Sequence, residues 1–287
     1  MPEYLAPGVY VEETSFRAKS IEGVSTSTTA FVGPARRGPP NELGELITSM
    51  GDFERIYGSL DSLNLGGQPV VNHLGHAVAA YFNNGGSRLY ISRVFVAAGD
   101  DDDGIAAATA NVINPAGATP ATRFVARFPG SAGNGQVVAT LVPVQATART
   151  LATAPGGSIV RVIQDTTPVL FVKRGPTEWR DEDDAANAFP ATLPTGLTEA
   201  KQPRTALLTL TLTATDADGN TATYEDLGFD PAHPRWLGNA LSTTPSRRRD
   251  HLERLFAIEN LDPVSPFALA GAIVDAETGS RVYALSG

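Results

Sequence analysis

The sequence predicts an α/β (mixed α+β) fold that begins with an extended N-terminal arm and ends in a β-rich region. A helical pattern over residues 69–83 lies between two strand-like runs at 30–33 and 89–96, which is the order of an α/β unit. Many later segments alternate between apolar and polar residues, as half-buried strands do. The first 29 residues follow neither period, so we expect them to form an arm that does not pack on itself.

The composition favours a β-rich, turn-rich protein over a helical one. The 287 residues allow one large domain or two ordinary ones, and 42% are hydrophobic, but 28 glycines and 21 prolines interrupt them. The net charge of −9 argues against nucleic acid as a general partner. Because the chain has no cysteine, it has no disulfide, no thiolate zinc site and no cysteine nucleophile.

Targeting and catalytic motifs are missing from the sequence. The N-terminus lacks the basic stretch and apolar run of a signal peptide. The longest apolar stretch, residues 267–274, is far shorter than a membrane span, so we expect no direct membrane insertion. There is no G-x-S-x-G elbow, no H-E-x-x-H pair and no Walker lysine. The sequence therefore predicts neither an enzyme nor a cofactor.

The arm carries the first short β-prone run. Pro7 and Gly8 predict a turn just before it, and residues 15–29 are rich in Ser and Thr with few apolar anchors. An extended segment with few partners of its own is the usual donor when one protein adds a strand to the sheet of another. A frayed terminus is the alternative. We favour donation, with the donated strand formed by Gly8, Val9, Tyr10, Val11 and Glu12.

The region 30–98 predicts a helix packed on a sheet. The pattern predicts a short apolar strand at Ala30 to Val32 and a central one at Leu89 to Val96. Ser49 can cap a short helix that Gly58 would end. The predicted helix between them begins at Pro69 and ends before a Gly-Gly pair. His73 and His76 in this helix could ligate a metal, but no third ligand is near them in the sequence, so we interpret them as polar-face residues.

The region 99–287 is predicted to be β-rich, and it can contain two subdomains. Four adjacent aspartates between Gly99 and Gly104 mark its start as an exposed loop. The pattern of alternation predicts strands at residues 123–128, 137–144, 158–163, 169–173, 205–215 and 268–274. Short helices are predicted at residues 178–188 and 247–256.

The residues Asp216, Asp218 and Asn220 have the D-x-D-G-N spacing of calcium-binding loops. The bidentate Glu of an EF-hand is missing, however, and Asp-Gly between two alternating runs is also an ordinary hairpin turn. We interpret the motif as a turn. Calcium binding at these residues would support an alternative function, in which the β-rich region is an exposed module that recognises a host or a glycan.

Eight motifs follow one another along about one third of the chain. They are Pro7–Glu13, Ile21–Ser27, Thr29–Gly33, Arg37–Pro39, Ile47–Ser49, Asp52–Gly58, Tyr81–Gly86 and Arg88–Val94. In this order and spacing they resemble the start of a contractile tail sheath protein, a family that covers myophage tail sheaths, R-type pyocins and phage-tail-like contractile injection systems. Weaker islands of resemblance follow at residues 128–135 and 232–237.

The resemblance implies a structural subunit that polymerises helically around an inner tube and contracts to drive that tube through a target envelope. It implies an extended arm at residues 1–29, the first half of a core sheath domain at 30–98 and a β-rich outer or insertion domain at 99–287. In this family the arms of one subunit add strands to the core sheets of its neighbours. The core strands beside the docking site would then contain Ala30, Phe31, Val32, Leu89, Tyr90, Ile91 and Val94.

The resemblance also implies partners and a place of assembly. The partners are copies of the chain itself, an inner tube protein, and baseplate and terminator or cap proteins. Assembly would take place in the bacterial cytoplasm, and the product would be a phage tail or a phage-tail-like particle. Sheath subunits usually continue, after a segment like residues 283–287, into a Gly-Gly-x-Asp-Gly loop and the second half of the core domain. The resemblance therefore implies a chain that lacks this C-terminal part.

Overall fold

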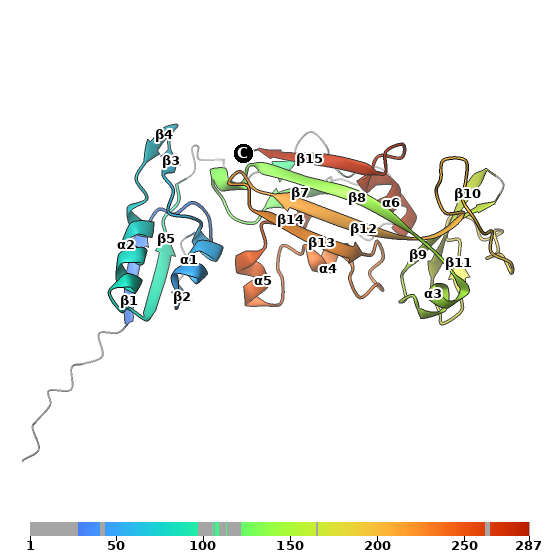
Figure 1. Cartoon of the computed structure of the whole chain (residues 1–287), viewed down its shortest axis with the longest axis horizontal. Helices are drawn as coiled ribbons and strands as arrows, with labels where there is room; N and C mark the ends of the chain where they lie inside the picture. The colour runs from blue at the N-terminus through green and yellow to red at the C-terminus, as the bar shows by residue number, and fades with distance from the viewer. Residues whose placement is uncertain are drawn as a thin grey trace, which may run out of the picture.

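The computed structural model describes residues 28–40, 44–96, 105, 107–108, 113, 122–164, 166–261 and 265–286. The chain is mixed α+β and rich in strands, and its elements form two units. The N-terminal unit, residues 28–96, contains β1 (Thr28–Gly33), β2 (Glu45–Ile47), α1 (Met50–Tyr57), β3 (Leu63–Leu65), β4 (Gln68–Val70), α2 (His73–Asn83) and β5 (Arg88–Arg93). Figure 1 shows this unit beside a long twisted sheet that the rest of the chain builds.

The β-rich unit, which comprises the described residues from 105 onward, contains a ten-stranded sheet and short helices. In chain order its elements are β6 (Ala107–Ala108), β7 (Arg123–Ala126), the 3-10 helix η2 (Ser131–Gly133), β8 (Gly135–Gln145), α3 (Ala148–Thr153), β9 (Ile159–Gln164), β10 (Thr167–Lys173), β11 (Trp179–Arg180), β12 (Thr205–Thr215), β13 (Thr221–Leu227), α4 (Leu237–Ala240), α5 (Arg248–Glu253), β14 (Phe256–Glu259), α6 (Pro266–Ile273) and β15 (Ser280–Ser286). The strand order is β11-β10-β9-β12-β8-β15-β6-β7-β14, and β13 pairs with β12.

The long strands β8 and β12 form the middle of this sheet. Their antiparallel pairing runs without a break from Ala206 opposite Gln145 to Thr215 opposite Gln136. The alternation along β12 puts every second side chain from Ala206 to Ala214 into the main core, as the period of two predicts. Leu207 points the other way and packs against a smaller cluster that contains Leu151. Phe124 and Tyr283 meet edge to face in this core, with their ring centres 4.9 Å apart. The strands β9 to β11, with α3, lie at the far end of the molecule in Figure 1.

The N-terminal unit has a three-stranded sheet of its own, in the order β1-β5-β2. The helices α1 and α2 supply Phe53, Ile56, Tyr57, Leu74 and Val78 to its core, which also contains Ile47, Leu89 and Ile91. Ser49 begins α1 by accepting a hydrogen bond from the N–H of Asp52 at 3.1 Å. Gly58 ends it with a φ of 93°. The strand β1 and the helix α1 therefore lie where the sequence predicts them.

The helix that the sequence predicts from Pro69 begins later. Pro69 lies in β4, which pairs with β3 in a hairpin that turns at Gly66 and Gly67, with φ of 60° and 80°. The helix α2 starts after Asn72, whose side-chain oxygen accepts a hydrogen bond from the N–H of Gly75 at 2.9 Å. The side chain of Asn72 therefore sets the helix start, and the expectation for Pro69 was wrong.

Three other expectations are corrected in the β-rich unit. Residues 266–273 form the helix α6 and not a strand, because Ser265 caps the helix by accepting from the N–H of Phe267 and Pro266 fits the first turn. Residues 178–188 form no helix, because Asp181 accepts hydrogen bonds from the main-chain N–H groups of Asp183 and Asp184 in a turn. The helix expected at 247–256 ends at Glu253, and β14 follows it.

No helix within the described ranges is long and apolar enough to cross a membrane.

Candidate functional site

The strand β1 lies at an edge of the N-terminal sheet. It pairs in parallel with β5, with Ala30 opposite Tyr90 and Phe31 opposite Ile91. On its other side, β5 pairs with β2. In the part of the chain that the structure describes, no strand pairs with the other edge of β1. A strand at the edge of a sheet presents main-chain N–H and C=O groups with which another strand can pair.

The main-chain groups of β1 divide between the two edges. The oxygen of Gly33 accepts a hydrogen bond from the N–H of Val94 at 2.9 Å, so the peptide groups of Gly33 point toward β5. Successive residues of a strand direct their N–H and C=O groups to opposite edges. The N–H and C=O groups of Ala30 and Val32 therefore point to the open edge of the sheet. These groups are the ones that a donated strand would bind.

The two faces of the sheet differ in burial. Leu89 and Ile91 are buried against the helices on one face, and Phe31 meets the ring of Tyr81 edge to face at 6.0 Å. On the opposite face the apolar side chains are exposed: Val32 is 69% exposed, and Leu46 and Val94 are each more than one-third exposed. The open edge thus continues into an apolar face that other described residues leave uncovered.

Buried polar contacts hold the loop after β1 against β5. Arg93 is almost fully buried, and its guanidinium donates hydrogen bonds to the main-chain oxygens of Ala35 at 3.1 Å and Gly38 at 2.8 Å. Burial lowers the pKa of Arg93 to about 10, so the side chain remains a cation at neutral pH. The hydroxyl of Tyr57 donates to the oxygen of Ile91 at 3.0 Å. These bonds join the loop after β1 and the helix α1 to β5.

The structure places the predicted core strands, while their role in docking stays a prediction. Ala30, Phe31 and Val32 lie in β1, and Leu89, Tyr90 and Ile91 lie beside them in β5, as the sequence led us to expect. Val94 follows β5 and extends its pairing with β1. The donor residues Gly8 to Glu12 lie outside the described residues. The buried Arg93 was missed by sequence reasoning; a cation inside an apolar strand was the available signal.

The three candidate calcium ligands meet in the turn between β12 and β13. The N–H of Asp216 donates to the oxygen of Asn220 at 3.0 Å, and Gly219 has a φ of 83°, so the segment is a hairpin turn as interpreted. The carboxylate of Asp216 accepts from the N–H of Asp218 at 3.0 Å and of Asn220 at 2.8 Å, and from the side chain of Asn220 at 2.8 Å. The Asp216 oxygens are therefore already occupied by donors.

Two arginines of the N-terminal unit bind the same turn. Arg37 lies 3.3 Å from the carboxylate of Asp216, and the Nε and one terminal nitrogen of Arg36 bind the carboxylate of Asp218. The hydrogen bond from Arg36 to Asp218 raises the pKa of Arg36, whereas burial lowers that of Arg37 despite the attraction of Asp216. These pairings leave the carboxylates little capacity for a cation.

The histidines and carboxylates in the rest of the described residues do not form a metal site either. No group of three or more His, Asp or Glu side chains in those residues has the required arrangement. His73 and His76 are both exposed on α2, the helix in which the sequence placed them.

No protein-family model matches the chain, and no curated protein matches it closely enough to serve as a relative.

Proposed function

We propose that this chain is a structural subunit of a contractile sheath and that it polymerises by strand addition at the open edge of β1. The subunits would wind helically around an inner tube, and their contraction would drive the tube through a target envelope. Copies of the chain, the tube protein, and baseplate and cap proteins would be its partners. The resemblance of the N-terminal motifs supports this proposal, and so does the geometry of β1.

One observation carries the proposal furthest. The N–H and C=O groups of Ala30 and Val32 face an edge that no described strand occupies, and their side chains are exposed. An added strand gains main-chain hydrogen bonds at the edge, and its alternate side chains can pack on the apolar face. Soluble proteins usually protect such an edge with charge, proline or a bulge. Here β1 carries none of these between Thr28 and Gly33.

Contraction would require no nucleotide in this proposal. Strand addition keeps the subunits joined, while the lattice changes between two packings of different energy. The rigid sheet, fixed by Arg93 and Tyr57, would transmit force between subunits, because its edge cannot reorganise without breaking buried hydrogen bonds.

The test changes a single main-chain donor at the open edge. Val32→Pro removes the N–H that points away from β5, and proline is tolerated in an edge strand at such a position. The matched control Val32→Thr changes the same side chain but keeps the N–H. We expect Val32→Pro to remain a folded monomer that forms no rods by electron microscopy, while Val32→Thr assembles like the unaltered chain. Rods of normal length and number from Val32→Pro would refute strand addition at this edge.

A further inference from the structure

The two units of the chain have separate sheets and largely separate cores. Within the described ranges, no strand of the β1-β5-β2 sheet pairs with a strand of the ten-stranded sheet. Of the buried residues in the core of the N-terminal unit, Leu252 alone comes from the β-rich unit, where it lies on α5. Apolar packing between the units is therefore small, and other contacts must fix their orientation.

The first of these contacts is the pair of arginines on the β12–β13 turn. On the N-terminal unit, Arg36 donates to the main-chain oxygen of Ser62 at 2.7 Å, and Arg37 donates to those of Glu54 at 3.2 Å and Arg55 at 2.7 Å. On the β-rich unit, the turn holds Asp216 and Asp218 in place through its own hydrogen bonds. Both sides are thus positioned in advance for the ion pairs.

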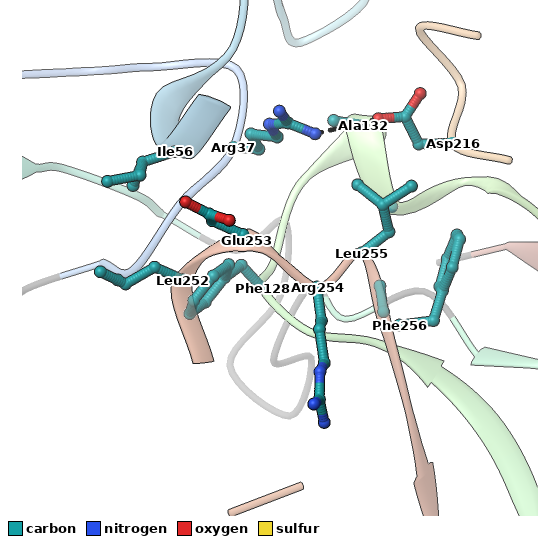
Figure 2. A pocket seen from close by; sticks show the side chains of 12 residues that line it. Arg37, Ile56, Phe128, Ala132, Asp216, Leu252, Glu253, Arg254, Leu255 and Phe256 are labelled. Atoms are coloured by element: carbon teal, nitrogen blue, oxygen red, sulfur yellow. Dashed lines mark hydrogen bonds and ion pairs between the residues drawn. The ribbon is translucent and has the colours of Figure 1, made fainter. Parts of the chain in front are cut away.

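The second contact involves α5. Glu253 lies 3.1 Å from the Nε of Arg55 on α1, and Arg248 forms an ion pair with Glu45 on β2. Between the two contacts lies a cavity of about 30 Å³, whose lining includes Arg37, Asp216, Ile56 and Leu252. Figure 2 shows Arg37 and Asp216 directed toward each other at this cavity. Charged groups therefore flank the apolar contact of Leu252.

We propose that these four ion pairs form a releasable latch between the units. The latch consists of Arg36–Asp218, Arg37–Asp216, Arg55–Glu253 and Glu45–Arg248. When it opens, the N-terminal unit changes its orientation as a rigid body, and each unit keeps its own fold. This inference concerns the single chain, so it goes beyond the proposed function and holds whether or not the chain polymerises.

The physical reason is the balance of forces across the junction. Domains joined by a small polar interface are expected to move relative to each other unless specific contacts prevent it. Exposed ion pairs such as Arg55–Glu253 weaken as salt screens them, because the Debye length falls from about 10 Å at 0.1 M to about 3 Å at 1 M. The pair with buried Asp216 is screened less. The loss of charges should therefore open the latch, and high salt should open it further.

The experiment follows the distance between the units by fluorescence resonance energy transfer between two dyes, one on each unit. Because the chain has no cysteine, the exposed residues Ala80 and Thr223 can be replaced by Cys and labelled. Asp218→Asn removes the carboxylate that pairs with Arg36, and Glu253→Gln removes one of the two ion pairs of the second contact, the pair with Arg55. The matched control Glu259→Gln removes an ion pair with Arg123 that lies entirely within the β-rich unit.

We expect the double variant Asp218→Asn/Glu253→Gln to show a lower mean transfer efficiency with a broader distribution, and 1 M NaCl to enlarge the change. The control should show the transfer efficiency of the unaltered chain. The variant Arg36→Asp/Asp218→Arg, which re-forms the ion pair with its charges exchanged, should also show that efficiency. If the double variant keeps the original efficiency at both salt concentrations, with an unchanged circular dichroism spectrum, the latch does not exist. If the double variant unfolds, the single variant Asp218→Asn is measured in 1 M NaCl instead. A transfer efficiency equal to that of the unaltered chain would then refute the proposal.

Discussion

The Nζ of Lys173 donates a hydrogen bond of 2.7 Å to the main-chain oxygen of Ala154, and it reaches the oxygens of Leu151 and Ala152 at 2.9 Å. These oxygens lie at the C-terminal end of α3, where the last carbonyl groups of a helix lack intrahelical donors. Lys173 is buried, and its ammonium lies 5.8 Å from the ring centre of Trp179. A single lysine of β10 thus holds α3 in place.

Replacing this lysine should destabilise the far end of the β-rich unit. Lys173→Met keeps most of the length of the side chain but leaves the three carbonyl oxygens without their donor, so we expect the free energy of unfolding to fall by about 1–3 kcal/mol. Urea titration followed by circular dichroism measures the change. Lys201→Met, at an exposed position, is the matched control. Equal stability of the two variants would show that the three hydrogen bonds contribute nothing.

The proposed donor segment gives a second prediction. Val9→Pro or Tyr10→Pro removes a main-chain N–H that an added strand needs, so each should block polymerisation while the monomer stays folded. Val9→Thr keeps the N–H and should polymerise. Sedimentation and electron microscopy of the assembled fraction measure the effect. Normal rods from both proline variants would mean that residues 8–12 are not the donated strand, even if the edge of β1 is the acceptor.

Calcium gives a third prediction. A ligand present at 100 times its dissociation constant stabilises a protein by about 2.7 kcal/mol, which corresponds to several degrees in Tm for a chain of this size. Because Arg36 and Arg37 pair with the carboxylates of Asp218 and Asp216, we expect millimolar calcium to leave the Tm unchanged. Differential scanning calorimetry with calcium, and with magnesium as the control, measures it. A rise specific to calcium would revive the alternative of a calcium-dependent binding module.

The elements that sequence reasoning predicted correctly are those whose signals are local. Ser49 and Gly58 mark the ends of α1 by their own chemistry, and the Thr-Leu alternation of β12 fixes which side chains face the core. The strand at residues 30–32 was predicted correctly because its short apolar run is also a local signal. These signals do not depend on any residue that is distant in the chain.

The errors arose where local signals were ambiguous. The short apolar run at residues 267–274 has neither a helical nor a strand period, so its composition did not reveal the helix that Ser265 and Pro266 begin. Pro69 is a good first residue for a helix, but the Gly66-Gly67 turn placed it in a hairpin. The contacts of Arg36 and Arg37 join residues about 180 positions apart, and no local pattern specifies such a pair.

The last prediction concerns pH. Burial lowers the pKa of His233 below its usual 6.5, and the Nδ1 of this side chain accepts a hydrogen bond from the N–H of Arg235 at 3.2 Å. Protonating Nδ1 would break that bond. Because the unfolded chain binds a proton more readily, the free energy of unfolding should be greatest above pH 6.5 and fall as the pH drops toward the lowered pKa. His233→Gln should flatten this slope in urea titrations at each pH, whereas His76→Gln, which removes an exposed imidazole, should keep it. An unchanged slope in His233→Gln would assign the acid sensitivity to other groups.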